Sequence, residues 1–189
     1  MDVKDLKALN AEVARRMDGA IEHVRKEIAG LRTGRASTAL LESVHVEAYG
    51  AEVPLNQVAA LSVPEPTLIV VQPFDPSLLS AIEKGIQKAN LGLNPGSDGK
   101  VLRVPIPPLT EERRREMSRL VHKQAEEGRN AVRQVRRDAN DRLKKMLKDH
   151  EISEDEERRA LDEVQKITDA HVSQIDEMQK KKDEELLGG

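Results

Sequence analysis

The segment RVPIPPLTEERR, residues 103–114, decides how the chain is organised. Its first half places three prolines between positions 105 and 108, which excludes a helix interior and favours a stiff, extended connection. Its second half begins a helix, because Thr110 is a favoured N-cap and the carboxylates of Glu111 and Glu112 suit the first turn. The segment therefore marks the passage from one kind of structure to another.

The composition of the chain changes at this segment. Residues 31–106 carry only 13 charged side chains in 76 positions, whereas residues 107–189 carry 40 in 83. Stretches rich in Val, Leu and Ile predict strands at 43–48, 58–63, 67–72 and 100–104, with a turn at 48–51. Residues 76–89 predict one amphipathic helix that has Pro76 at its first position. The middle of the chain is therefore expected to be a small α/β domain.

Long amphipathic helices are predicted on both sides of this domain. Apolar residues recur every three to four positions in the first helix, which we expect to stop near Thr33-Gly34: Leu6, Leu9, Val13, Met17, Val24 and Ile28. The same spacing follows Thr110 as far as Met146. A break at 149–152 precedes Ser153 and Glu156, which form a capping box for a last helix. His171 lies beside the apolar stripe of that helix, as a partly buried residue.

These elements predict an α+β protein in which an elongated three-helix bundle carries a small inserted domain. Residues 1–33 and 106–189 form the bundle domain, and residues 34–105 form the inserted, hinged α/β domain. The chain passes between the two at Thr33 and Gly34 and again at Pro105, Ile106, Pro107 and Pro108. Because two single-strand crossings make a weak joint, we expect the domains to move relative to each other.

The residues give little support to an enzyme, a metal site or a membrane protein. The chain contains no cysteine, and its five histidines are scattered without the spacing of a metal or catalytic motif. Gly99-Lys100 does not fit a phosphate loop, because position 94 is Asn and position 101 is Val. No apolar run approaches the length of a membrane span, and the N-terminus lacks the order of a secretory signal. We therefore expect a cytoplasmic protein without a cofactor.

The charges are uneven, although 31 basic and 34 acidic residues give a net charge of only −3. Residues 111–148 carry a net charge of +6 and residues 149–189 a net charge of −8. Seven basic residues fall within about 100° on a helical wheel and are here called the basic ridge: Arg115, Arg119, Arg129, Arg133, Arg136, Arg137 and Lys144. Two explanations of these basic residues stay equally good. They form a solvent-exposed face that makes salt bridges to the last helix, or they bind phosphate. With one Tyr and one Phe, base stacking is disfavoured and folded RNA backbone is the compatible target.

Four motifs together resemble the bacterial ribosome recycling factor family. They are LRTGRA at 31–36, LGLNP at 91–95, RVPIPPLTEERR at 103–114 and VRRDAND at 135–141. They occur in the family's order, and the likeness covers nearly the whole length of the chain.

The resemblance implies an L-shaped, monomeric factor that binds the post-termination ribosome and, with elongation factor G and GTP hydrolysis by that partner, separates the subunits. It implies no catalytic residue of the chain's own. The family's arginines that contact large-subunit ribosomal RNA correspond to Arg136, Arg137 and Arg133. Arg129 joins them because it lies on the basic ridge. Arg32, beside the first crossing, is similar to a family position near the hinge and is expected to face RNA.

Two other classes of function stay open from the residues alone. A helical scaffold or chaperone-like adaptor would present an exposed apolar groove and bind partners with little salt dependence. An enzyme acting on RNA would need clusters of acidic and basic catalytic groups, which the sequence lacks.

Overall fold

The computed structural model describes residues 1–187, which divide into two compact units. Unit 1 comprises Met1–Leu31 and Glu116–Glu184, and unit 2 comprises Arg32–Arg115 together with residues 185–187. Sequence reasoning put the domain boundaries at 33/34 and 105/106, and the compact units divide at 31/32 and 115/116. None of the helices within residues 1–187 combines the length and apolar character that a membrane crossing needs.

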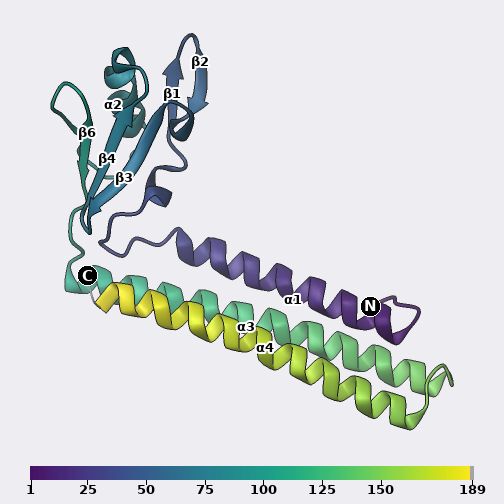
Figure 1. Cartoon of the computed structure of the whole chain (residues 1–189). Coiled ribbons are helices and arrows are strands. Elements are labelled where there is room, and N and C mark those ends of the chain that lie inside the picture. The colour runs from purple at the N-terminus through teal and green to yellow at the C-terminus, as the bar shows by residue number, and fades with distance from the viewer. Residues whose placement is uncertain (188–189) are drawn as a thin grey trace. The chain divides into compact units, whose positions relative to one another are not determined.

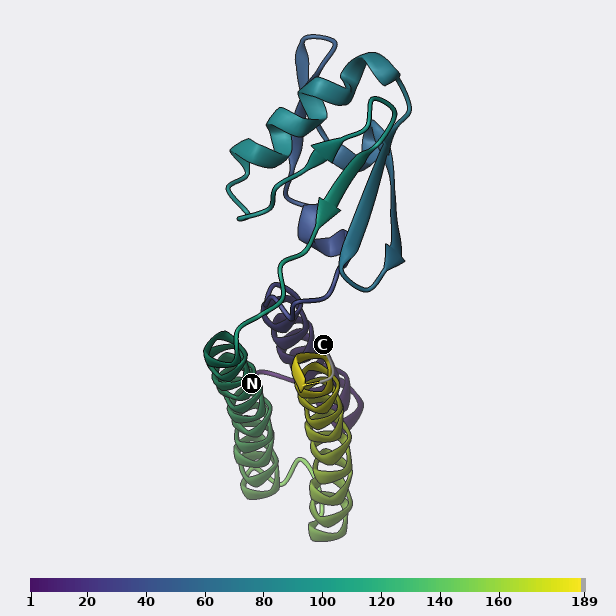
Figure 2. The ribbon, with the colours of Figure 1, turned by 90° about the vertical axis from the view of Figure 1, so that its left-hand side faces the viewer.

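Three long helices make up most of unit 1: α1 (Leu6–Ala29), α3 (Glu111–Lys148) and α4 (Glu154–Leu187). Figures 1 and 2 show them running side by side. The guanidinium of Arg142 donates to the carbonyl of Val3, whereas Gly128 lies against Val24, so α1 and α3 are antiparallel. Their buried side chains form one core: Val3, Leu9, Val13, Met17, Ile21, Ala125, Val132, Val135, Ala139, Leu143, Ala160, Val164 and Ile175.

The predicted N-terminal starts of α3 and α4 are confirmed. The hydroxyl of Thr110 accepts from the backbone N–H of Arg113 at 3.2 Å. Ser153 and Glu156 form the reciprocal capping box, with N–H to carboxylate at 2.8 Å and N–H to hydroxyl at 3.2 Å. The predicted end of the first helix is wrong: α1 ends at Ala29, because the chain leaves the helix at its next glycine, Gly30, rather than at Gly34.

Unit 2 contains a four-stranded antiparallel sheet in the order β3-β4-β6-β5 and a separate hairpin of β1 and β2. The strands are β1 (His45–Ala48), β2 (Ala51–Pro54), β3 (Ala59–Glu65), β4 (Leu68–Pro73), β5 (Gly96–Ser97) and β6 (Leu102–Pro105). The α-helix of this unit is α2 (Leu79–Lys88), and short 3-10 turns cover Thr38–Leu41, Leu55–Gln57 and Pro76–Leu78. Sequence reasoning missed β2 and β5, which are too short to carry a strand pattern of their own.

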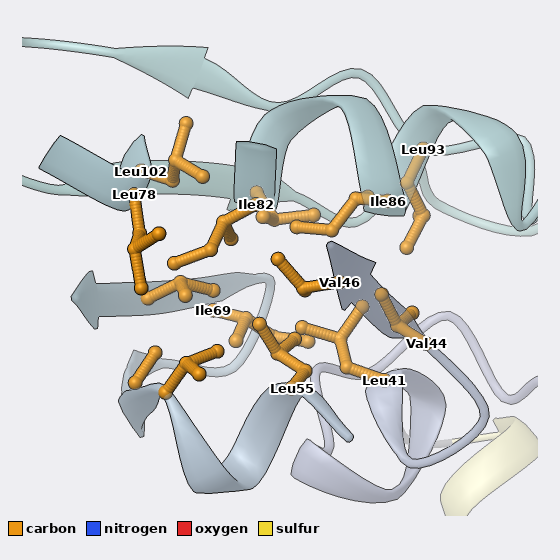
Figure 3. Packing of buried hydrophobic residues seen from close by; sticks show 14 of the residues in the cluster. Leu41, Val44, Val46, Leu55, Ile69, Leu78, Ile82, Ile86, Leu93 and Leu102 are labelled. Atoms are coloured by element: carbon orange, nitrogen blue, oxygen red, sulfur yellow. The ribbon is translucent and has the colours of Figure 1, made fainter. Parts of the chain in front are cut away.

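One apolar core holds unit 2 together (Figure 3). Alternate residues of β4 and β6 face inward, as in Ile69, Val71, Leu102 and Val104, all fully buried. They meet Ile82 and Ile86 of α2, which are also buried. Gly85 lets α2 approach β1, since a Cβ atom at this position would lie 2.7 Å from the carbonyl oxygen of His45. The helix and the first hairpin are therefore held in direct contact.

Candidate nucleic-acid interface

Helix α3 carries the basic ridge because its apolar residues occupy one face and fix its rotation in the bundle. The buried residues of α3 are Val121, Ala125, Gly128, Val132, Val135, Ala139, Leu143 and Met146. On a helical wheel with 100° between successive residues, these buried positions occupy an arc that adjoins the arc of the basic ridge. Arg129, Arg133, Arg136 and Arg137 thus lie on one side of one helix, beside the core.

Arg129 is held within the bundle. Its side chain is only 16% exposed, and its guanidinium lies 2.8 Å from Asp176 of α4 and 3.2 Å from Glu126. It also donates to the side-chain oxygen of Gln179. These contacts use most of the donors of the guanidinium, which joins α3 to α4. Arg129 therefore lies on the ridge as a residue that links two helices.

The other three arginines are less constrained. Arg133 lies 3.6 Å from Glu126, at the long end of an ion pair, and Arg137 donates to the side-chain oxygen of Gln134 at 2.8 Å. The side chain of Arg136 has no hydrogen-bond or ion-pair partner among residues 1–187. The positive charge of Arg136 and Arg137 is thus not neutralised by a carboxylate of the described chain.

Asp138 directly follows these arginines, but its carboxylate is turned to other partners. It accepts from Gln134 at 2.8 Å and from Arg16 of α1 at 2.8 Å. The Gln134 hydrogen bond, followed by the Arg16 hydrogen bond, lowers the pKa of Asp138 below its ordinary value of 3.8. The carboxylate therefore stays ionised at neutral pH and is engaged with α1, which leaves the neighbouring arginines available. Sequence reasoning missed Arg16 and Gln134, because nothing near Asp138 in the sequence identifies its partner on α1.

Arg32 belongs to unit 2, whereas Arg129, Arg133, Arg136 and Arg137 belong to unit 1. Its side chain is half-buried, and its guanidinium lies near Gly92, where a Cβ atom would be 3.5 Å away. Two of the motifs, LRTGRA and LGLNP, therefore meet within unit 2.

The residues of the two crossings differ in their surroundings. Gly34 has a φ of +77°, and a Cβ atom there would lie 3.2 Å from the backbone nitrogen of Leu109, so the crossings touch at this point. Thr33 is buried. Pro105 is the last residue of β6, and the N–H of buried Ile106 donates to the carbonyl of Thr67 at 2.7 Å. Pro107 and Pro108 follow as exposed residues outside any helix or strand.

The described part of the chain contains no group of three or more His, Asp or Glu side chains placed to hold a metal ion. His171 is a buried residue of the bundle, as predicted. Its Nδ1 lies 2.7 Å from the carbonyl oxygen of Ile167 and its Nε2 lies 2.8 Å from Asp18 of α1. The histidine thus links α4 to α1.

Known proteins similar to this chain share one description. The family model described as "Ribosome recycling factor" matches residues 24–187. The ribosome-recycling factor of Rhodospirillum centenum is 59% identical over 92% of this chain and 94% of its own length. That of Shouchella clausii is 52% identical over 96% of this chain and 98% of its own length.

Solved structures agree with this result. A solution structure of the ribosome recycling factor is 46% identical, with a TM-score of 0.81 over the full length of both chains. A second chain is 50% identical, with a TM-score of 0.69 over 98% of this chain and all of its own length. It comes from models of the T. thermophilus ribosome recycling factor and the E. coli elongation factor G bound to the E. coli post-termination complex. The predicted α+β class and the resemblance are therefore confirmed, and the chain belongs to the ribosome recycling factor family.

Proposed function

We propose that this protein docks on large-subunit ribosomal RNA through Arg133, Arg136 and Arg137. In the same proposal it then works with elongation factor G, whose GTP hydrolysis drives separation of the ribosomal subunits after termination. The partnership is supported by the related chain of known structure, which is placed with elongation factor G on a post-termination complex. A protein with this task acts in the cytoplasm, as a monomer and without a catalytic site of its own.

The RNA proposal rests on one observation: the positive charge of the arginines at 133–137 is not cancelled by the neighbouring carboxylate of Asp138. Asp138 is engaged by Arg16 and Gln134, and Arg136 has no partner among the described residues. A guanidinium suits phosphate through its planar fork of donors, and contacts with phosphates fix the register of a protein on RNA. Arg129 contributes by holding α3 against α4, so that the neighbouring arginines project from a rigid helix.

The hinge belongs to the same proposal. Pro105 and Ile106 are bonded to the sheet of unit 2, so the bending within the second crossing falls on Pro107 and Pro108. Thr33 and Gly34 supply the first crossing, with Arg32 next to them as a further RNA contact. A motor factor that pushes on unit 2 would then move it as a lever, while unit 1 stays bound through the ridge.

The test is co-sedimentation of the protein with large ribosomal subunits at two salt concentrations. We expect Arg136→Ala to weaken binding about tenfold, or by roughly 1.4 kcal/mol, which is typical of one charge-assisted contact. Arg158→Ala is the matched control, because Arg158 is an exposed arginine of α4, paired at 3.8 Å with Asp155. Equal binding by Arg136→Ala and Arg158→Ala would show that the ridge is not the RNA-binding surface.

The same co-sedimentation measurement distinguishes an RNA-binding factor from the helical adaptor that the sequence also allowed. An adaptor would bind through apolar surface, and its binding would change little with salt. In α1, α3 and α4 of the described chain, only Leu120 and Leu187 are exposed large apolar residues. Two exposed apolar side chains do not make up the extended apolar groove that an adaptor would present, which favours the RNA proposal.

A further inference from the structure

Unit 2 contains a groove between the hairpin of β1 and β2 and the helix α2. Its volume is about 310 Å³, at the lower end of the range for ligand sites. Its lining is polar and includes His45, Glu47, Glu52, Ser80, Lys84 and Lys88. The backbone fixes the spacing of its walls, because Gly85 packs against the carbonyl of His45 with no room for a side chain. This groove lies outside the surface proposed above for RNA binding.

One wall of the groove carries two carboxylates in an unfavourable arrangement. Glu47 of β1 and Glu52 of β2 are directly opposite each other in the antiparallel ladder, and both line the groove. Like charges that face each other across two strands destabilise a hairpin. The stability of the hairpin therefore does not account for this pair, whereas a cationic ligand between the two carboxylates would.

The opposite wall is basic. Lys84 and Lys88 are four residues apart on α2, so their side chains lie on one face of the helix, and both line the groove. Among residues 1–187 neither lysine forms an ion pair with Glu47 or Glu52. The groove thus separates an acidic wall from a basic wall.

Both aromatic residues of the chain are exposed, and one of them, Tyr49, is linked to the lining of the groove through Asp75. Tyr49 is 79% exposed and Phe74 is 67% exposed. The hydroxyl of Tyr49 donates to Asp75, and Asp75 also accepts from the N–H and the hydroxyl of Ser77, which lines the groove. Tyrosine is enriched among the residues that contribute most to protein–protein binding. The exposed ring of Tyr49, connected through Asp75 to Ser77 in the lining, is therefore available to a partner protein next to the groove.

We propose that this groove binds a short segment of a partner protein that presents an arginine next to an acidic residue. The guanidinium lies between the carboxylates of Glu47 and Glu52, and the acidic side chain faces Lys84 and Lys88. Two carboxylates clamp a guanidinium through charge-assisted hydrogen bonds, which relieves their mutual repulsion. The same carboxylates repel a phosphate backbone, so a nucleic acid is disfavoured here. The inference does not depend on RNA binding by α3.

The test is an NMR titration of the ¹⁵N-labelled full chain with the capped dipeptide acetyl-Arg-Asp-amide. We expect saturable shifts of the amides of Glu47, Glu52 and Lys84, with a dissociation constant of about 1 mM for so small a probe. Acetyl-citrulline-Asn-amide has nearly the same shape without the charges, and it should leave these amides unmoved. Inorganic phosphate, added alone, should also fail to shift the amides of Glu47 and Glu52.

Variants of the lining residues test whether the dipeptide binds in the groove. Glu47→Gln/Glu52→Gln should weaken binding of the dipeptide at least about tenfold, whereas Glu65→Gln, at an exposed glutamate of β3, should bind as the unchanged protein does. Glu52→Gln alone should weaken binding and also raise the midpoint of thermal unfolding, because it removes one of two facing charges. The proposal is overturned if the charged and neutral dipeptides give the same shifts, if no saturable shift occurs, or if the double variant binds normally.

Discussion

The guanidinium of Arg129 lies 2.8 Å from the carboxylate of Asp176, and this ion pair joins α3 to α4. Because the arginine is largely buried, its removal leaves Asp176 and Gln179 without their donor. We expect Arg129→Ala to lower the free energy of unfolding by about 1–2 kcal/mol. Arg136→Ala should leave that free energy unchanged within about 0.5 kcal/mol. Urea unfolding of both variants, followed by circular dichroism, measures the difference. Equal losses would mean that Arg129 has no special structural role.

The dependence of large-subunit binding on salt should report how many phosphates the ridge contacts. Each phosphate contact releases bound counterions, so the removal of one arginine reduces the slope of log K against log salt by about 1. We expect this reduction for Arg136→Ala and for Arg133→Ala, and about twice as much for the double variant. The measurement is binding at four or more salt concentrations. A double variant with an unchanged slope would place the RNA contacts elsewhere.

Two glycines within helices should respond in opposite ways to the same substitution. A Cβ atom at Gly128 of α3 would lie 2.2 Å from a methyl carbon of Val24 in α1, whereas a Cβ atom at Gly19 of α1 would meet nothing within 4 Å. Val24 is buried and β-branched, so it has little freedom to move aside. We expect Gly128→Ala to destabilise the protein by about 1–3 kcal/mol and Gly19→Ala to stabilise it by about 0.5–1 kcal/mol.

Thermal and urea unfolding of the two variants provide the test. Each substitution makes the same chemical change within a helix. If the two changes in the free energy of unfolding have opposite signs, the difference is due to the packing of α3 against α1. A stabilised Gly128→Ala variant would show that the two helices can separate at this point without cost.

The contacts of Asp138 predict a dependence of stability on pH. Its pKa in the folded protein is lowered, so the carboxylate stabilises the fold at pH values above its ordinary pKa of 3.8. That contribution is lost as the pH falls below 3.8 through the lowered folded pKa. We expect Asp138→Asn to cost about 1 kcal/mol at pH 6 and progressively less as the pH falls below 3.8. Urea unfolding of both proteins at several pH values gives the comparison. A constant difference across this range would contradict the role of the charge.

The parts of the fold that follow from neighbouring residues could be predicted. Thr110, Ser153 and Glu156 act within a few positions of themselves, and the apolar spacing of a long helix repeats often enough to be recognised. The strand β2 was missed because four residues ending at Pro54 become a strand only when they pair with β1. A short strand of this kind has no pattern apart from its partner.

The contacts of the candidate site could not be predicted either, because they too depend on partners far away in the sequence. The motif at 135–141 identified Arg136 and Arg137, but the sequence did not distinguish them from Arg129. That distinction depends on Asp176, which lies 47 positions away in the sequence, and on the packing of α4. The engagement of Asp138 likewise depends on Arg16, 122 positions away. Ion pairs between helices can be assigned only when the bundle is known.

The proposed lever predicts that the joint between the units must bend for the subunits to separate. Because the chain has no cysteine, two introduced cysteines react alone. Lys26 of α1 and Arg35 are exposed and lie on either side of Thr33-Gly34, in unit 1 and unit 2 respectively. We expect Lys26→Cys/Arg35→Cys, joined by a reducible bis-maleimide, to bind large subunits normally and to lose subunit separation with elongation factor G and GTP. Reduction of the linker should restore separation. Glu22→Cys/Lys26→Cys, crosslinked within α1, is the control and should stay active. If the first crosslinked protein separated subunits at the normal rate, motion at this crossing would not be part of the mechanism.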